Sequence, residues 1–191
     1  MSGINLTATL KDHEQFIEQV SRASGQPVQQ CYQCGKCTAG CPIAFSMDIP
    51  PNRVMRMVQL GLRDHALSCS SIWLCAYCST CSVRCPRNVN LARVMDSLRI
   101  IAGKEKRAKS ARSRHVDLFN RNFLNSIKRY GRLHEFETMT MYNLKSGQPF
   151  KNADTGLYML SRGKLKFLIK KTGQMDQIRR IFDRVKEWEG K

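Results

Sequence analysis

The chain has 191 residues, which suffices for one domain or for a small domain with an extension, and 42% of them are hydrophobic. Nine cysteines would suggest a disulfide scaffold in a short secreted protein, but residues 1–10 show no basic and apolar leader segment, and the odd count leaves one thiol unpaired. Since no apolar stretch of about 18 residues occurs either, the sequence predicts a cytoplasmic protein with reduced thiols and no membrane span.

The formal charge of +17 arises from 32 Lys and Arg against 15 Asp and Glu, which suggests nucleic acid, anionic lipid or an acidic protein as partner. Near the middle of the chain, six basic residues stand against the single acid Glu105: Lys104, Lys106, Arg107, Lys109, Arg112 and Arg114. This run has no interleaved aromatic residues and belongs to no recognised reading motif, so we expect no nucleic-acid binding. Protein docking is the preferred interpretation of its charge.

The first predicted element is an amphipathic helix at 12–24, which Gly25 and Pro27 end. A run of four cysteines and a proline follows: Cys31-x2-Cys34-x2-Cys37-x3-Cys41-Pro42. Beyond it, the apolar spacing at 52–62 predicts a second helix, with Pro50 and Pro51 at its start.

The same order of elements then recurs. A second run reads Cys75-x2-Cys78-x2-Cys81-x3-Cys85-Pro86, and a helix is predicted at 91–103. The tripeptide Arg53-Val54-Met55 of the earlier helix returns as Arg93-Val94-Met95. This self-similarity predicts a duplicated unit with pseudo-twofold symmetry and two equivalent sites.

Both runs match the spacing of bacterial 4Fe-4S motifs, so the sequence predicts two 4Fe-4S clusters. In two-cluster ferredoxins, the cysteine before the proline serves the cluster of the other motif. We therefore expect the first cluster on Cys31, Cys34, Cys37 and Cys85, and the second on Cys75, Cys78, Cys81 and Cys41. Because four thiolates saturate each cluster, no open iron position is left, and we expect electron transfer and no catalytic site on this chain.

Zinc is the main competing metal, but structural zinc usually takes separated cysteine pairs or cysteine–histidine sets, and the four histidines do not have that spacing. Gly35 and Gly40 suit loops that approach a cluster closely, although ordinary turns also use glycine. Cys69 lies outside both motifs. Its alternative interpretations are a spare ligand, a redox thiol and a buried small residue, of which the last is preferred.

Charge also predicts a difference between the two clusters. Positive charge favours the reduced, more negative form of a cluster. Lys36, Arg84 and Arg87 flank ligands of the first cluster, whereas mainly Ser, Thr and Tyr flank those of the second. We therefore expect the first cluster to have the higher potential.

The pattern weakens after position 103. A helix is predicted at 115–136, followed by a loosely ordered region in which glycines and Pro149 recur. The last predicted element is an amphipathic helix at 176–190. The expected organisation is thus a cluster-binding domain at 1–103 and a basic, partly irregular helical extension for partner docking at 104–191.

Together these motifs resemble the C subunit of heterodisulfide reductase. The resemblance spans roughly residues 15–103 and is carried by CYQCGKCTAGCP, Pro50-Pro51-Asn52-Arg53, SIWLCAYCSTCSVRCP and the helix through Arg93-Val94-Met95. It implies a mainly α fold of the α-helical ferredoxin type, since the interval between the motifs has room for a full helix. Small bacterial ferredoxins are β-rich and have a shorter interval.

In that family, the C subunit relays electrons between a flavin-containing A subunit, which binds FAD, and a cysteine-rich B subunit that reduces a disulfide. The resemblance implies the same partners here, in energy or sulfur metabolism. Two alternatives stay open, a freestanding dicluster ferredoxin and the iron–sulfur subunit of a quinone-linked oxidoreductase. Both differ from the relay subunit in what the chain would purify with.

Overall fold

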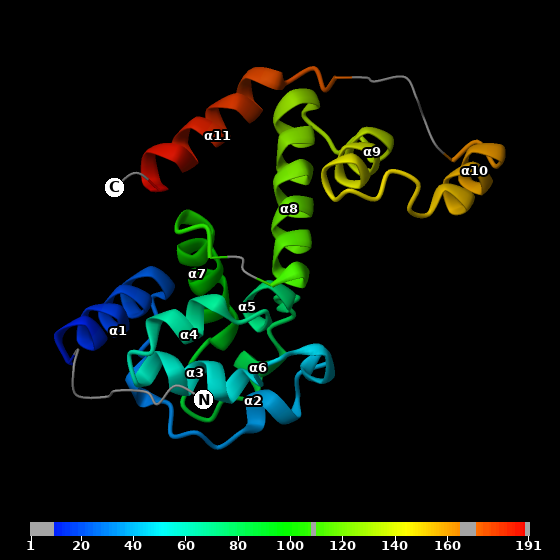
Figure 1. Ribbon diagram of the computed structural model, residues 1–191. Coiled ribbons are helices and arrows are strands. Elements are labelled where there is room, and N and C mark those ends of the chain that lie inside the picture. Colours follow the sequence, from blue (N-terminus) through cyan, green and yellow to red (C-terminus); the bar gives the residue numbers. More distant parts are fainter. Residues whose placement is uncertain (1–9, 108–109, 165–170, 190–191) are drawn as a thin grey trace. The chain divides into compact units, whose positions relative to one another are not determined.

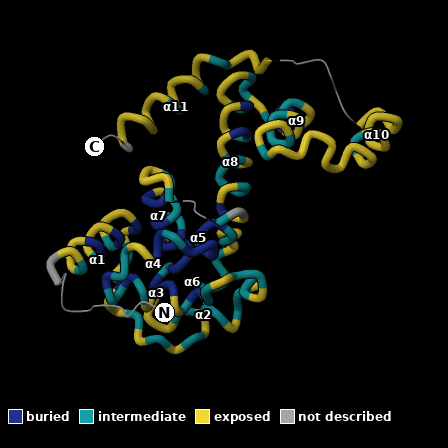
Figure 2. The backbone as a smooth tube through the Cα atoms, in the orientation of Figure 1, coloured by how far each residue is buried: buried dark blue, intermediate teal, exposed yellow. Residues whose placement is uncertain are grey.

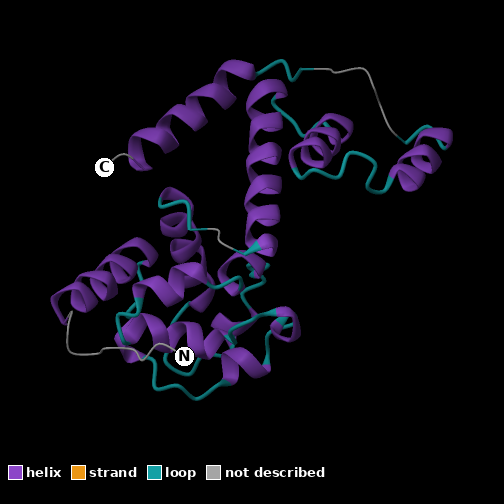
Figure 3. Ribbon diagram, viewed as in Figure 1, coloured by secondary structure: helices purple, strands orange, loops and turns teal. Residues whose placement is uncertain are grey.

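The computed structural model describes residues 10–107, 110–164 and 171–189, which form helices joined by loops, with no strand among them (Figure 3). The expected mainly α fold is confirmed. The N-terminal segment 1–9 and Lys109, which entered the sequence-based expectations, lie outside these residues. The chain divides into two compact units, Met1–Arg114 and His115–Lys191.

The first unit consists of short and long helices that alternate with the cysteine runs (Figure 1). Its elements are α1 Leu10–Ser24, η1 Val28–Gln30, α2 Lys36–Ala39, η2 Ala44–Ser46, α3 Pro51–Gln59, α4 Arg63–Ser68, α5 Ser71–Leu74, α6 Thr80–Val83 and α7 Leu91–Lys104. The three helices expected at 12–24, 52–62 and 91–103 correspond to α1, α3 and α7. The sequence did not predict the one-turn helices of the cysteine runs.

Local sequence explains where the long helices begin. Pro51 occupies the first turn of α3, where its missing N–H costs nothing. At α7, the Asn90 side chain caps the helix by accepting a hydrogen bond from the backbone N–H of Arg93. Both helices therefore start a short distance after a cysteine run, and their first turns lie near the cysteines.

The core of the first unit forms where α7 packs against α1, α3, α4 and α5. Its largest fully buried side chains are Phe16, Met55, Leu67, Ile72, Met95 and Leu98. Figure 2 shows this buried region in dark blue within the first unit. Gly61, at the turn after α3, has a φ of +66°, and a Cβ there would lie 2.3 Å from Cβ of His13 on α1. Only glycine fits this contact without a shift of backbone.

The second unit contains helices where the sequence predicted a loosely ordered region. Its elements are α8 Ala111–Tyr130, which begins before the division, α9 Glu135–Lys145, α10 Ala153–Ser161 and α11 Met175–Glu189. The expected helical, partly irregular extension is confirmed, although α9 and α10 form where the sequence predicted loose order, and α10 accommodates Gly156.

The helix predicted at 115–136 corresponds to α8, which both begins and ends earlier, at Ala111 and Tyr130. Gly131 adopts a φ of +78° and ends α8 after Tyr130. His134 then caps α9 by accepting a hydrogen bond from the N–H of Glu137. The expected C-terminal helix is confirmed as α11. Among the described residues, none of the helices is both long and apolar enough to cross a membrane.

Part of the basic run after α7 is used within the first unit. Arg107 pairs with Asp64 and with Glu105, and Glu105 also pairs with Arg63. The Arg112 side chain donates a hydrogen bond to the carbonyl oxygen of Ser46 at 2.7 Å. Within the first unit, these arginines therefore connect the residues that follow α7 to α4 and η2.

Candidate iron–sulfur sites

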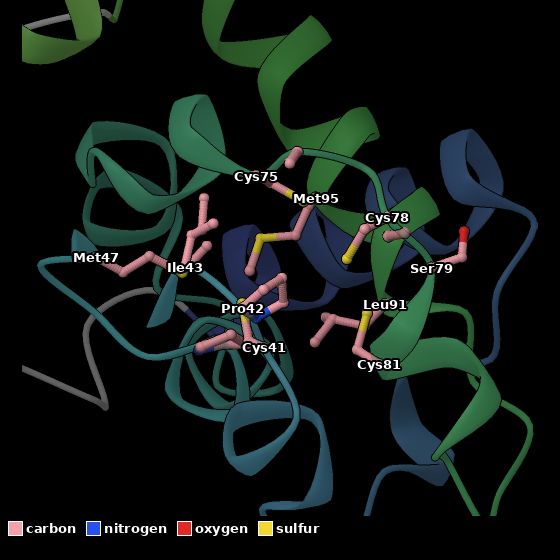
Figure 4. Close-up of a pocket in the computed structure, with 13 residues that line it drawn as sticks. Cys41, Pro42, Ile43, Met47, Cys75, Cys78, Ser79, Cys81, Leu91 and Met95 are labelled. Carbon is pink, nitrogen blue, oxygen red and sulfur yellow. The ribbon is translucent and has the colours of Figure 1, made fainter. Parts of the chain in front are cut away.

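One pocket brings together cysteines from both runs. Its lining includes Cys75, Cys78 and Cys81 of the second run and Cys41, the last cysteine of the first (Figure 4). Apolar side chains complete the wall: Ile43, Met47, Pro51, Leu91 and Met95. A set of four thiols in a mostly apolar pocket is the donor set that a 4Fe-4S cluster requires. The residues present therefore fit the second expected cluster, with Cys41 contributed from the other half.

The remaining cysteines also approach one another across the two halves. Desolvation raises the pKa of Tyr32, and Cys34 of the first run and Cys85 of the second raise it further, so both cysteines lie near Tyr32. The helices α2 and α6, which carry Cys37 and Cys81, are in contact. The position of Cys34 and Cys85 near the same tyrosine supports the crossed ligand assignment for the first cluster, which stays a prediction, and the contact between α2 and α6 brings the two sites close together.

Burial governs the acidity of several of these thiols. Burial is the main cause that raises the pKa of Cys37, Cys75 and Cys81, whereas hydrogen bonding with Thr80 lowers the pKa of the exposed Cys78. Iron ligation requires thiolates, so iron would replace these protons on binding. Within the described part of the chain, no three His, Cys, Asp or Glu side chains are placed to hold a single metal ion.

The backbone of the two cysteine runs repeats an uncommon conformation. The residues just before and just after the second cysteine have positive φ in both runs, Gln33 and Gly35 in the first and Tyr77 and Ser79 in the second. A left-handed conformation costs a residue other than glycine about 1 kcal/mol. Gly35, which we expected to allow a close approach to a cluster, is thus matched by Ser79 in the second run. The predicted duplication therefore extends to the backbone conformation.

Each half also ties its third cysteine to the helix that follows. The hydroxyl of Thr38, next to Cys37, donates to the side-chain oxygen of Asn52 at 2.7 Å. The hydroxyl of Ser82, next to Cys81, donates to the side-chain oxygen of Asn90 at 2.7 Å. These bonds fix α2 to the start of α3 and α6 to the start of α7, so the rigid helices position the cysteine loops.

A second pair of equivalent contacts reaches the first cysteine of each run. From α3, the Gln59 side-chain nitrogen donates to the carbonyl oxygens of Val28 at 3.1 Å and Cys31 at 2.7 Å. From α7, Arg99 donates to the carbonyl oxygens of Ile72 at 2.9 Å and Cys75 at 2.7 Å. Sequence reasoning missed both residues, although each stands six positions after the arginine of the repeated Arg-Val-Met tripeptide, because their partners are distant in the chain.

One acidic residue links the two halves. Asp48, in the loop after the first run, accepts hydrogen bonds from the backbone N–H groups of Ser70 at 2.8 Å and Ser71 at 3.0 Å. Although burial raises the pKa of Asp48, these bonds and that from the Ser71 hydroxyl lower it below its usual value. The carboxylate therefore caps α5, the helix that leads into Cys75.

Cys69 does not belong to either group of cysteines. Its side chain is buried, with 4% exposure, and its sulfur donates to the carbonyl oxygen of Ala66 at 3.2 Å. Burial raises its pKa to about 11. The preferred interpretation of Cys69 as a buried small residue is confirmed.

Comparison with known proteins agrees with this geometry. Residues 27–89 match the family described as 4Fe-4S dicluster domain, so this part of the chain is a dicluster iron–sulfur domain. The expected 4Fe-4S cofactors are confirmed at the level of this domain, and the cysteines that ligate each cluster stay predictions.

The expected resemblance to the C subunits of heterodisulfide reductases is confirmed too. The chain is 33% identical over 91 residues to the C subunit of the H(2):CoB-CoM heterodisulfide,ferredoxin reductase of Methanothermobacter thermautotrophicus, which covers 48% of this chain and 49% of that protein. It is 41% identical over 78 residues to an iron–sulfur C subunit of the CoB--CoM heterodisulfide reductase of Methanocaldococcus jannaschii, covering 41% of each. A protein of Archaeoglobus profundus that is named as similar to the heterodisulfide reductase C subunit is 29% identical over 108 residues, or 53% of this chain and 57% of that protein. The chain spans about half the length of the curated relatives it matches.

Proposed function

We propose that this chain is the electron-relay subunit of a heterodisulfide reductase-like complex. It would pass electrons through two 4Fe-4S clusters between a subunit that contains FAD and a cysteine-rich subunit that reduces a disulfide. The observation that carries the proposal is the pocket that gathers Cys41 with Cys75, Cys78 and Cys81. Cysteines shared between halves in this way would keep two clusters within one small domain and close to each other.

The chain's own residues would hold and orient the clusters. Each cluster, when bound, takes up and releases one electron at a time. The crossed cysteines supply the thiolates, and the hydroxyl–asparagine contacts fix their loops to α3 and α7. The second cysteine of each run, Cys34 or Cys78, is exposed. Each cluster would therefore have one corner near the surface, where an external donor or acceptor can approach.

We further propose that the basic extension, residues 104–191, docks on another member of this complex. Large apolar side chains are exposed on its helices, among them Leu157 on α10 and Trp188 on α11. The chain from His115 to Lys191 carries 16 Lys and Arg against 8 Asp and Glu, a formal excess of +8 that favours an acidic partner surface. A partner that covered these helices would bury the exposed apolar residues.

Isolation of the tagged protein from its native host under anaerobic conditions tests the proposal. Mass spectrometry should identify a flavoprotein and a second cysteine-rich chain in the same complex. Iron and sulfide analysis should give about eight irons on this chain, as two 4Fe-4S clusters require. A monomer with the same iron content would instead establish a diffusible ferredoxin, and co-purification with a membrane anchor would establish a quinone-linked role.

A further inference from the structure

The two halves of the cluster-binding domain differ in charge at one equivalent position. Gln59 and Arg99 stand at the same distance from the repeated Arg-Val-Met tripeptide, and each donates to the first cysteine of its run and to the residue three positions before it. The contacts to the cysteine carbonyls have the same length, 2.7 Å. The hydrogen bonds are thus shared by the two halves, while one donor is neutral and the other is a cation.

The charge on Arg99 is permanent and only partly exposed to water. A guanidinium stays protonated at any relevant pH. None of the ion pairs found among the described residues involves Arg99, whose side chain donates instead to the two carbonyl oxygens. A half-buried charge is screened less than an exposed one. Its influence on a neighbouring cluster is therefore stronger than that of a solvated lysine or arginine.

The charges that flank the first cluster are of that solvated kind. Lys36, Arg84 and Arg87 are all exposed. The arginines of the repeated tripeptide, Arg53 and Arg93, occur once in each half and so do not distinguish the sites. Gln59 and Arg99 therefore differ by one half-buried positive charge. The residues that flank the cysteines do not reveal this difference.

We propose that Arg99 raises the reduction potential of the cluster on Cys75, Cys78, Cys81 and Cys41 above that of the cluster in the Gln59 half. This inference rests on the proposed function, since it assumes that both clusters are bound. A single electron from an external reductant would then reside on the second cluster, whose core gains that electron while the first stays oxidised. The order is the reverse of the one expected from the flanking sequence.

Exchange of the two side chains tests this order. Anaerobic redox titration of the cluster-loaded protein, followed by low-temperature electron paramagnetic resonance, should show two one-electron reductions. Arg99→Gln should move the higher of the two downward by at least a tenfold change in its reduction equilibrium, which is about 59 mV. Gln59→Arg should move the lower one upward. Arg99→Lys, which keeps the charge, should leave the potentials nearer to those of the unmodified protein.

The two exchanges make the outcome unambiguous. If Arg99→Gln shifts the lower potential, or neither, the proposed order is overturned. If Arg99→Gln loses iron, the Gln59→Arg variant provides the test by itself. An unchanged lower potential in Gln59→Arg would then contradict the proposal. Iron and sulfide analysis separates failure of this inference from failure of the proposed function. An unmodified protein without two clusters would refute the relay function. Two clusters whose potentials do not move in the variants would refute only the role of Arg99.

Discussion

The two units of this chain make opposite use of the same sequence pattern. Both α3 and α11 have apolar residues at helical spacing, but Val58 of α3 is fully buried, whereas Val185 of α11 is 45% exposed. Every buried hydrophobic side chain of the described residues lies in the first unit, and the buried residues of the second unit are polar. An amphipathic pattern therefore predicts a helix in both units, but it does not tell whether the apolar face is covered within the chain.

Removal of one crossed cysteine should have the largest effect, and it acts only on the first unit. Cys41→Ser should remove or convert the same cluster as Cys81→Ser, because we expect both residues to ligate it. The electron paramagnetic resonance spectra of these two variants should therefore match each other and differ from those of Cys37→Ser. Cys69→Ser, the control, should retain both clusters. A spectrum of Cys41→Ser that matches Cys37→Ser would show that the ligands are not crossed.

A methyl group at Gly61 should destabilise the first unit strongly. Gly61→Ala places a Cβ against the backbone and Cβ of His13 at a positive φ, which should cost about 2–4 kcal/mol. The matched control is Gly156→Ala in α10, where no atom lies within 4 Å of the new methyl. That change should stabilise α10 by up to about 1 kcal/mol. Anaerobic thermal unfolding followed by circular dichroism compares the two, and equal effects would contradict the close contact between α1 and Gly61.

A pair of valines compares the two units most directly. Val58→Ala should destabilise the first unit by about 2 kcal/mol, because it removes two methyl groups from a fully buried site. Val185→Ala should change stability by less than about 0.5 kcal/mol in the isolated chain. The measurement is the unfolding midpoint of each cluster-loaded variant. A large loss for Val185→Ala would mean that α11 is covered within the free protein.

The cap on α5 should contribute a smaller amount. Asp48→Ala leaves the N–H groups of Ser70 and Ser71 without their acceptor, which should cost about 1 kcal/mol. Asp176→Ala in α11 is the control, since this aspartate is exposed and makes only a 3.8 Å ion pair with Arg179. It should cost less than about 0.5 kcal/mol. If both variants unfold at the same temperature, the cap on α5 has no energetic role.

Much of the cluster-binding domain could be predicted because its signals are local. Cysteine spacing indicates the clusters, and apolar spacing with a starting proline indicates α3. Gln59 and Arg99 could not be found in this way, since their partners lie 24 to 31 positions away in the chain and meet them only after folding. The second unit misled sequence reasoning for another reason. Gly156 was taken as a break, although α10 accommodates it.

The contact from Asp48 to α5 has a consequence for how the protein acquires its clusters. Asp48 follows Cys41 by seven positions, and the helix that it caps delivers Cys75 to the pocket that Cys41 also lines. The first loop thus has to fold before the second site is complete. We therefore expect an order of maturation, in which the second site becomes competent to take up its cluster only after the loop that carries Asp48 has folded.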